Sequence, residues 1–177
     1  SSQCWNTFST GTATVNTPHV VDSYTYMSNL SNNALLMIAG STTGYSTNVQ
    51  AILPRFASPL QQLSMSFDYC FESATQGTLI VGYWNDSINL FTPVDTIAPH
   101  SGNYMCDTVS FAAATDSNAH IAFSWVKTST WYGVAIDNIR VYNSVNGEVL
   151  PWVAILGPTR INAFDTAAFT AQLLDGD

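Results

Sequence analysis

Short segments with a two-residue apolar period are the feature that most constrains the fold of this chain. Along residues 63–71, five large apolar side chains alternate with smaller or polar ones: Leu63, Met65, Phe67, Tyr69 and Phe71. Successive side chains of an extended strand point to opposite faces, so this pattern predicts a strand with one face in a core. A second apolar run at 78–84 follows Gly77, and we expect the two segments to pair as a hairpin.

The rest of the chain repeats this design, with apolar runs separated by Gly, Pro, Asn and Ser. Ala34–Ala39 is apolar throughout and predicts a central strand, whereas Val49–Leu53 stops at Pro54, which suits an edge strand or a strand end. Four more segments are expected to be strands: Phe91–Ala98, Tyr104–Ala112, His120–Val126 and Tyr132–Tyr142. No helical pattern of useful length competes. We therefore expect an all-β protein, an antiparallel β-sandwich of the jelly-roll type.

The charge of the chain excludes two classes of partner. Charged residues make up 9% of the sequence, and 4 Lys and Arg stand against 12 Asp and Glu, for a formal net charge of −8. Binding to nucleic acid or to an anionic membrane needs clustered cations, which these scattered residues do not supply. No run of 18 apolar residues predicts membrane insertion. A low-charge surface rich in Ser, Thr and Asn is common in secreted β-proteins, so we expect a secreted protein.

A change in composition predicts a domain boundary near residue 143. Asn143–Glu148 is polar and Pro151 follows it. We expect a jelly-roll domain over 1–142, a linker over 143–152, and two strands within 153–177. Two strands cannot bury a core by themselves, so residues 153–177 are expected to begin a further domain.

Six stretches, in their order and spacing, carry a resemblance to a known family: Cys4-Trp5 and residues 51–56, 63–67, 77–84, 91–97 and 135–141. They resemble the MAM-like jelly-roll adhesin modules of Bacteroidetes surface proteins, which are related to the cleaved-adhesin domains of gingipains. Residues 153–177 resemble the start of an Ig-like or PKD-like repeat. The resemblance implies a concanavalin-like or galactose-binding-like jelly roll displayed on the bacterial cell surface. It also implies adhesion or carbohydrate binding, and often bound calcium.

Asp137 is the candidate metal ligand because it stands in the apolar segment 134–139. A buried carboxylate is costly unless it is paired. An Arg side chain or a backbone N–H is one possible partner, and a hard cation with oxygen ligands is the other. The resemblance favours structural calcium, although calcium requires six or more oxygen ligands.

Three aromatic residues are candidates for ligand binding: Trp84, Trp131 and Tyr132. Sugar rings stack on aromatic faces, so these side chains would form a platform for a glycan if they are exposed. The alternative is that they pack in the core. The expected partners are a glycan or a host surface protein, together with other domains of the same polypeptide.

The sequence carries no catalytic pattern. His19, His100 and His120 belong to no nucleophile elbow or zinc motif, and the only glutamates are Glu72 and Glu148. Two non-enzymatic functions remain, a binding module and a structural spacer that displays other domains. Exposed Trp84 and Trp131 side chains would favour the binding module.

Overall fold

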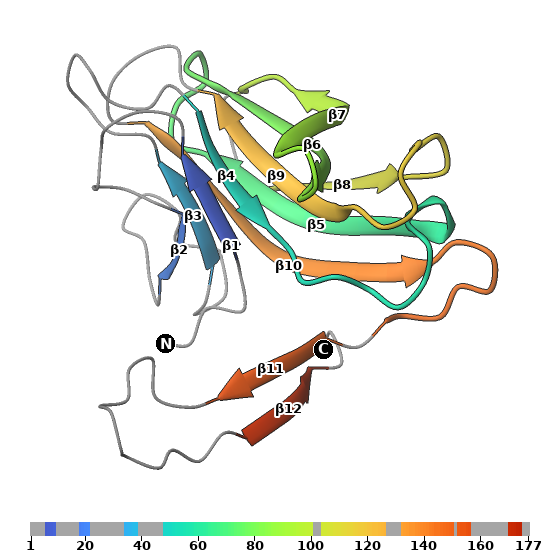
Figure 1. The fold of residues 1–177 in the computed structure, drawn as a ribbon. Coiled ribbons are helices and arrows are strands. Elements are labelled where there is room, and N and C mark those ends of the chain that lie inside the picture. The colour runs from blue at the N-terminus through green and yellow to red at the C-terminus, as the bar shows by residue number, and fades with distance from the viewer. Residues whose placement is uncertain are drawn as a thin grey trace, which may run out of the picture.

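The computed structural model describes residues 6–9, 18–21, 34–38, 48–100, 104–126, 132–150, 152–156 and 170–174. Within these ranges, two five-stranded antiparallel sheets form a sandwich (Figure 1). Sheet A has the order β1-β4-β9-β6-β7, and sheet B has the order β2-β3-β10-β5-β8. A separate two-stranded antiparallel sheet contains β11 and β12.

The strands of sheet A are β1 Asn6–Ser9, β4 Asn48–Ile52, β9 His120–Val126, β6 Thr78–Asn85 and β7 Leu90–Ile97. The strands of sheet B are β2 His19–Val21, β3 Ala34–Ile38, β10 Gly133–Asn143, β5 Leu63–Phe71 and β8 Met105–Ser110. The last pair is β11 Trp152–Leu156 and β12 Thr170–Leu174. The only helical element among the described residues is the 3₁₀ turn η1, Leu60–Gln62. The all-β jelly-roll prediction is therefore confirmed, and none of the described residues form a helix that could cross a membrane.

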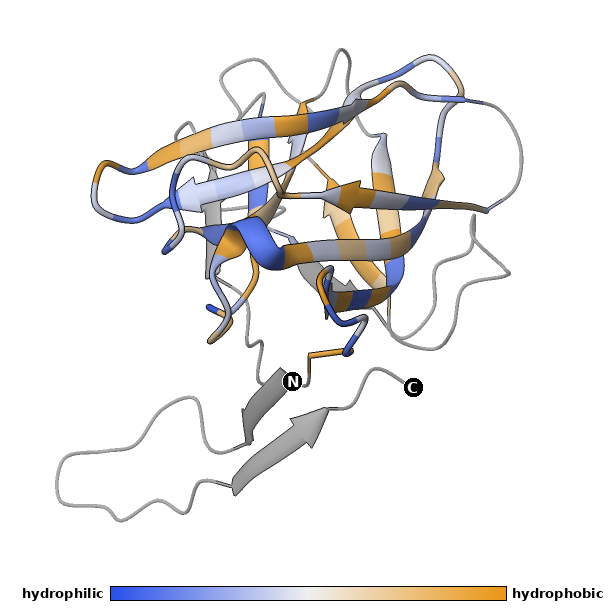
Figure 2. Ribbon diagram, turned by 90° about the vertical axis from the view of Figure 1, so that its right-hand side faces the viewer, coloured by the Kyte–Doolittle hydropathy of each residue, from blue (hydrophilic) through white to orange (hydrophobic). Residues whose placement is uncertain are grey.

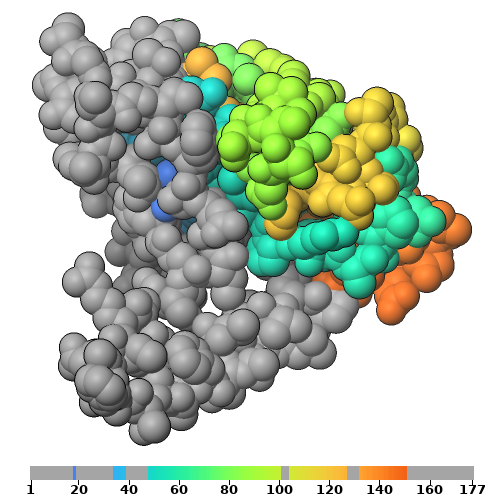
Figure 3. Space-filling model, in the orientation of Figure 1, coloured from blue at the N-terminus to red at the C-terminus, as the bar shows by residue number. Residues whose placement is uncertain are grey.

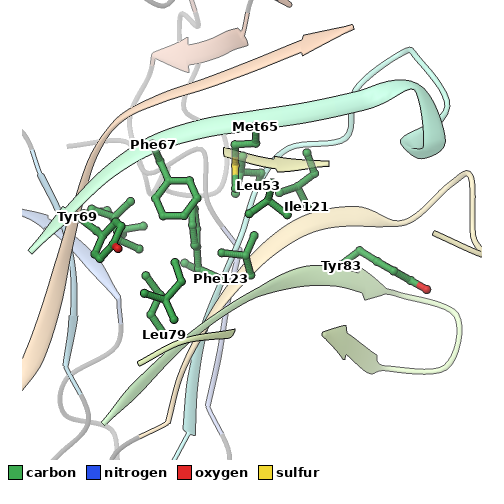
Figure 4. Close-up of a cluster of buried hydrophobic side chains, with 14 of the residues drawn as sticks. Leu53, Met65, Phe67, Tyr69, Leu79, Tyr83, Ile121 and Phe123 are labelled. Carbon is green, nitrogen blue, oxygen red and sulfur yellow. The ribbon is translucent and has the colours of Figure 1, made fainter. Parts of the chain in front are cut away.

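The hydrophobic core lies between the inner faces of the two sheets, and the alternation in the sequence builds it. Hydrophobic and hydrophilic residues follow one another along the strands (Figure 2). The apolar β5 side chains predicted to face a core are all buried: Leu63, Met65, Phe67, Tyr69 and Phe71. Phe67 of sheet B meets Phe123 of sheet A edge to face, with ring centroids 5.1 Å apart (Figure 4). Because each large apolar side chain gains roughly 1.5–3 kcal/mol on burial, this shared core holds the sheets together.

The predicted hairpin between residues 63–71 and 78–84 is wrong. β5 pairs with β10 and β8, whereas β6 pairs with β9 and β7, so residues 72–77 carry the chain from one sheet to the other. Gly77 has a φ of +80°, and a Cβ built there would lie 2.2 Å from the ring of Trp125. Two strands that face one core from opposite sheets show the same alternation as two strands of one hairpin, so the pattern alone did not separate the two cases.

Two predictions of strand position have different outcomes. The segment Ala34–Ala39 was expected to be central, and β3 does lie between β2 and β10. The edge-strand alternative for Val49–Leu53 is wrong, because β4 lies between β1 and β9. The other alternative is confirmed, since β4 ends at Ile52, two residues before Pro54.

The segment that follows β10 folds back onto the sandwich. The Ser144 backbone N–H and its hydroxyl both donate to the carbonyl of Gln62, at 2.7 and 2.9 Å. The Leu150 N–H donates to the carbonyl of Val141 at 2.8 Å, and the Leu150 side chain packs against the core. Residues 143–150 are therefore fastened to the sandwich at both ends of the segment. The domain limits 1–142, 143–152 and 153–177 stay predictions.

Candidate functional site

One end of sheet A gathers six polar side chains from three segments of the chain. The segments follow β4, form the β6–β7 turn, and lead from β8 into β9. Their side chains are named here the polar end: Arg55, Asn85, Asp86, Asp116, Asn118 and His120. The pairing of β9 with β4 and β6 brings the segments together, since Ile52 lies opposite Ala122 and Trp84 opposite His120. The β6–β7 hairpin (green) and the β9 region (yellow) lie side by side on the surface in Figure 3.

His120 joins β9 to both neighbouring segments. Its Nε2 lies 2.9 Å from Oδ2 of Asp86 in the β6–β7 turn. Its Nδ1 lies 3.0 Å from the backbone carbonyl oxygen of Leu53, just after β4. The His120 side chain is only 15% exposed, whereas that of Asp86 is 64% exposed. The imidazole is thus held in one orientation, and it holds an exposed carboxylate in turn.

A second chain of hydrogen bonds fixes the rest of the polar end. Arg55 Nη2 donates to Oδ1 of Asn118 at 2.5 Å, and the Asn118 N–H donates to Oδ1 of Asp116 at 2.9 Å. The other Asp116 oxygen accepts a hydrogen bond from Nδ2 of Asn85. Side chains held in this way lose little conformational entropy when a ligand binds, which favours affinity.

The β6–β7 turn is held by Asn85. Its Oδ1 accepts the backbone N–H groups of Ser87 and Ile88 at 2.8 and 3.3 Å. Tyr83, two residues earlier, bonds the hydroxyl of Thr115 at 3.1 Å, and this hydrogen bond lowers the pKa of the Tyr83 phenol. The turn and the β8–β9 loop are therefore tied to one strand.

Several groups of the polar end remain available to a ligand. Arg55 and Asn118 are exposed, and each brings N–H groups beyond the single bond that joins them. Asp86 Oδ1 has no hydrogen-bond partner among the described residues. The polar end thus presents donors and acceptors next to one another, which is the combination that a hydroxyl-rich ligand requires.

An aromatic pair lies beside the polar end on the outer face of sheet A. Trp84 is opposite His120 of β9 on one side and opposite Phe91 of β7 on the other. Trp84 is 4% exposed and packs with Ile52 and Ala122, while Phe91 is half-buried. The expectation that Trp84 offers an exposed ring is therefore wrong. Cross-strand packing buries it between the side chains of the neighbouring strands.

Tyr132, another of the predicted aromatic residues, is not a neighbour of Trp84. Tyr132 is 43% exposed and precedes β10, and its carbonyl accepts the Trp125 indole N–H at 3.2 Å. The Trp125 ring in turn lies against Gly77, one residue before β6 begins. Trp84 stands six residues along β6 from Thr78, which is about 20 Å at 3.3 Å per residue. Trp84 and Tyr132 thus belong to opposite ends of the sandwich, and Trp131 lies outside the described residues.

Asp137 is buried, with 8% of its surface exposed, as the sequence predicts. Its Oδ1 accepts the backbone N–H of Asn138 at 2.7 Å, so one of the two expected kinds of partner is present. Asn138 has a φ of +48°, at an irregularity in the pairing of β10 with β5. Where side chains are described, no three His, Cys, Asp or Glu residues are grouped so as to hold a metal ion. Calcium at Asp137 stays a prediction.

Sheet B carries a hydrogen-bonded network on its outer face that the sequence analysis missed. Asp68 of β5 lies opposite Asp137. The Oδ2 atom of Asp68 accepts hydrogen bonds from the Tyr104 hydroxyl at 2.5 Å and from Nδ2 of Asn138 at 2.7 Å. Burial and the hydrogen bond to Asp68 raise the pKa of Tyr104. The network joins β5, β10 and the residue before β8, and it stabilises the irregular part of β10.

The polar end was also missed, because its members are far apart in the sequence. The only local signal is the short polar segment Asp116-Ser117-Asn118-Ala119-His120, directly before an apolar strand. Nothing in the sequence connects that segment with Arg55 or Asp86. The contacts depend on strand order, which the periodicity of the sequence does not contain.

Comparisons with known proteins bear on the fold. No family model and no curated protein sequence matches this chain. Among solved structures, the K1 cleaved adhesin domain of Lys-gingipain from Porphyromonas gingivalis W83 is similar, with a TM-score of 0.57 and 13% identity. The match covers 79% of this chain and 90% of that domain. TmCBM61, solved in complex with β-1,4-galactotriose, matches with a TM-score of 0.53 and 10% identity, over 80% of this chain and 90% of the other. The chain thus shares the jelly-roll sandwich fold of an adhesin domain and of TmCBM61.

Proposed function

We propose that this chain is a non-catalytic extracellular module that binds a glycan through the polar end. This proposal rests on one observation: Arg55, Asp86 and Asn118 present exposed hydrogen-bonding groups in fixed positions, and Phe91 nearby has a half-buried ring. Sugar recognition combines hydrogen bonds to hydroxyls with contact between the apolar side of a sugar ring and an aromatic side chain. The polar end supplies the hydrogen-bonding groups, and Phe91, at the start of β7 after the β6–β7 turn, supplies the aromatic side chain.

Two further facts support this proposal. The fold is shared with an adhesin domain and with TmCBM61, whose solved complex contains β-1,4-galactotriose. The low content of charged residues suits a secreted β-protein. We accordingly propose that the module is displayed as part of a bacterial surface protein. A host surface protein that carries such a glycan would be an equivalent partner.

The proposal is tested by titrating ¹⁵N-labelled protein with a panel of oligosaccharides, β-1,4-galactotriose among them. Amide shifts should change in the β6–β7 turn and in residues 115–120. Arg55→Ala should weaken binding at least about tenfold, as expected for a side chain that anchors an interface. Tyr132→Ala, at the other end of the sandwich, is the matched control. Shifts confined to Tyr132 and its neighbours would overturn the placement of the site, and no binding by any sugar would overturn the function.

We also propose that structural calcium binds near Asp137, where it would stabilise the sandwich and take no part in glycan recognition. The burial of Asp137 and its position opposite Asp68 support it. These carboxylates would supply two of the six or more oxygens that calcium requires, and the remainder would have to come from backbone carbonyls, water or residues outside the described ranges.

A structural spacer is the second candidate function, and two observations favour it. Trp84, whose exposure would have favoured a binding module, is only 4% exposed. Residues 143–150 are fastened to the sandwich through Ser144 and Leu150, so the chain leaves the described sandwich from an anchored position. A spacer requires such a firm junction. Spacer and glycan-binding functions are compatible, because the junction and the polar end use different residues.

A further inference from the structure

We infer that the polar end selects neutral glycans and rejects acidic ones, such as uronates and sulfated sugars. This inference rests on the proposed glycan-binding function and names the class of ligand for the same site. It follows from which charges stand at the polar end and from how each is already paired.

Carboxylates outnumber permanent cations at the polar end. Asp86 and Asp116 are its two acids, and Arg55 is its single permanent cation. Of the other cations in the sequence, Arg140 stands in sheet B opposite Ser66, while Lys127 and Arg160 lie outside the described residues. The whole chain carries a formal net charge of −8. A ligand carboxylate or sulfate would therefore meet repulsion both at the site and on approach.

Arg55 offsets only part of that repulsion. Its Nη2 is already bonded to Oδ1 of Asn118, and the backbone N–H of Asn118 is bonded to Asp116. The bond to Asn118 uses one of the five guanidinium N–H groups, so Arg55 can still donate to a ligand, but its single positive charge stands against the two carboxylates of the polar end.

The exposed carboxylate of Asp86 points to the same class of ligand. Its Oδ2 faces His120, and Oδ1 is open to a donor. A sugar hydroxyl donates to a carboxylate and at the same time accepts from a neighbouring N–H, whereas an ionised carboxylate or sulfate only accepts. A neutral hydroxyl can therefore satisfy both Asp86 and Arg55, whereas an anionic group in the same place can satisfy Arg55 alone.

The experiment compares neutral sugars with acidic derivatives of the same sugar: galactose with galacturonic acid, glucose with glucuronic acid, and lactose with sulfated lactose. Affinities are measured by NMR titration at low salt and again at about 1 M salt, where the Debye length falls to about 3 Å. We expect each neutral sugar that binds to bind at least about tenfold more tightly than its acidic counterpart, a ratio within reach of like-charge repulsion. High salt should reduce that ratio.

Asp86→Asn removes one charge from the polar end and keeps an oxygen that can accept from His120. In this variant, the affinities for the acidic sugars should come closer to those for their neutral counterparts. Asp95→Asn is the matched control, because Asp95 is also exposed and lies on β7, away from the turn, so its ratio should match the wild type. Tighter or equal binding of the acidic sugars by the wild-type protein would overturn this inference and leave the proposed function standing. Failure of every sugar to bind would instead overturn the proposed function.

Discussion

Replacing Gly77 with alanine should destabilise the sandwich more than any ordinary surface change. Gly77 has a φ of +80°, and a residue with a Cβ pays roughly 1–2 kcal/mol in that left-handed region. The new Cβ would also lie 2.2 Å from two atoms of the Trp125 ring, and Trp125 is fully buried, with no open space to retreat into. Overpacking of this kind costs about 1–3 kcal/mol. The two terms together predict a loss of about 2–5 kcal/mol from a domain stability of about 5–15 kcal/mol.

Gly147→Ala is the control that separates backbone strain from packing. Gly147 has a φ of +74°, yet nothing lies within 4 Å of a Cβ built there, so this variant should lose only about 1–2 kcal/mol. Urea unfolding followed by tryptophan fluorescence measures both losses, and an unchanged m-value shows that the comparison is valid. If the two variants lose the same free energy, the Trp125 ring yields without cost and the packing argument is refuted.

Three further predictions concern pH, metal and the junction. Burial and a hydrogen bond to Asp68 raise the pKa of Tyr104 above its ordinary 10.0, so the unfolded chain ionises first and stability should fall as pH rises past about 10. Urea unfolding between about pH 8 and pH 11 should show a smaller decline in Tyr104→Phe, and an equal decline would contradict the assignment. Calcium bound near Asp137 would make exhaustive chelation lower the melting temperature, and an unchanged melting curve would end the calcium proposal. Limited proteolysis should spare residues 143–150 in the wild type and cut there faster in Ser144→Ala, while early cleavage of the wild type would mean that the segment is loosely held.

The composition and the two-residue periodicity of the sequence were sufficient to predict the class of fold. The alternation along residues 63–71 identified every inward-facing side chain of β5, because the side-chain period of a strand does not depend on its neighbours. The burial of Asp137 followed for a similar local reason, since apolar residues surround it on its own strand. Local pattern therefore determined which faces enter the core and that the part of the chain described by the structure contains almost no helix.

The order of the strands within the two sheets determined the features that the sequence did not predict. Whether residues 63–71 and 78–84 share a sheet, whether Trp84 is exposed, and whether Arg55 meets Asn118 all depend on which distant strands become neighbours. Such pairings are chosen by the total packing of both sheets, in which each strand gains only when its partners are already in place. The sequence around Trp84 would look the same whether its ring were buried or exposed. Only its cross-strand neighbours His120 and Phe91, which come from distant segments or the next strand, show that the ring is buried. The polar end exists for the same reason, because β9 lies between β4 and β6 and so brings three separate segments to one end of sheet A.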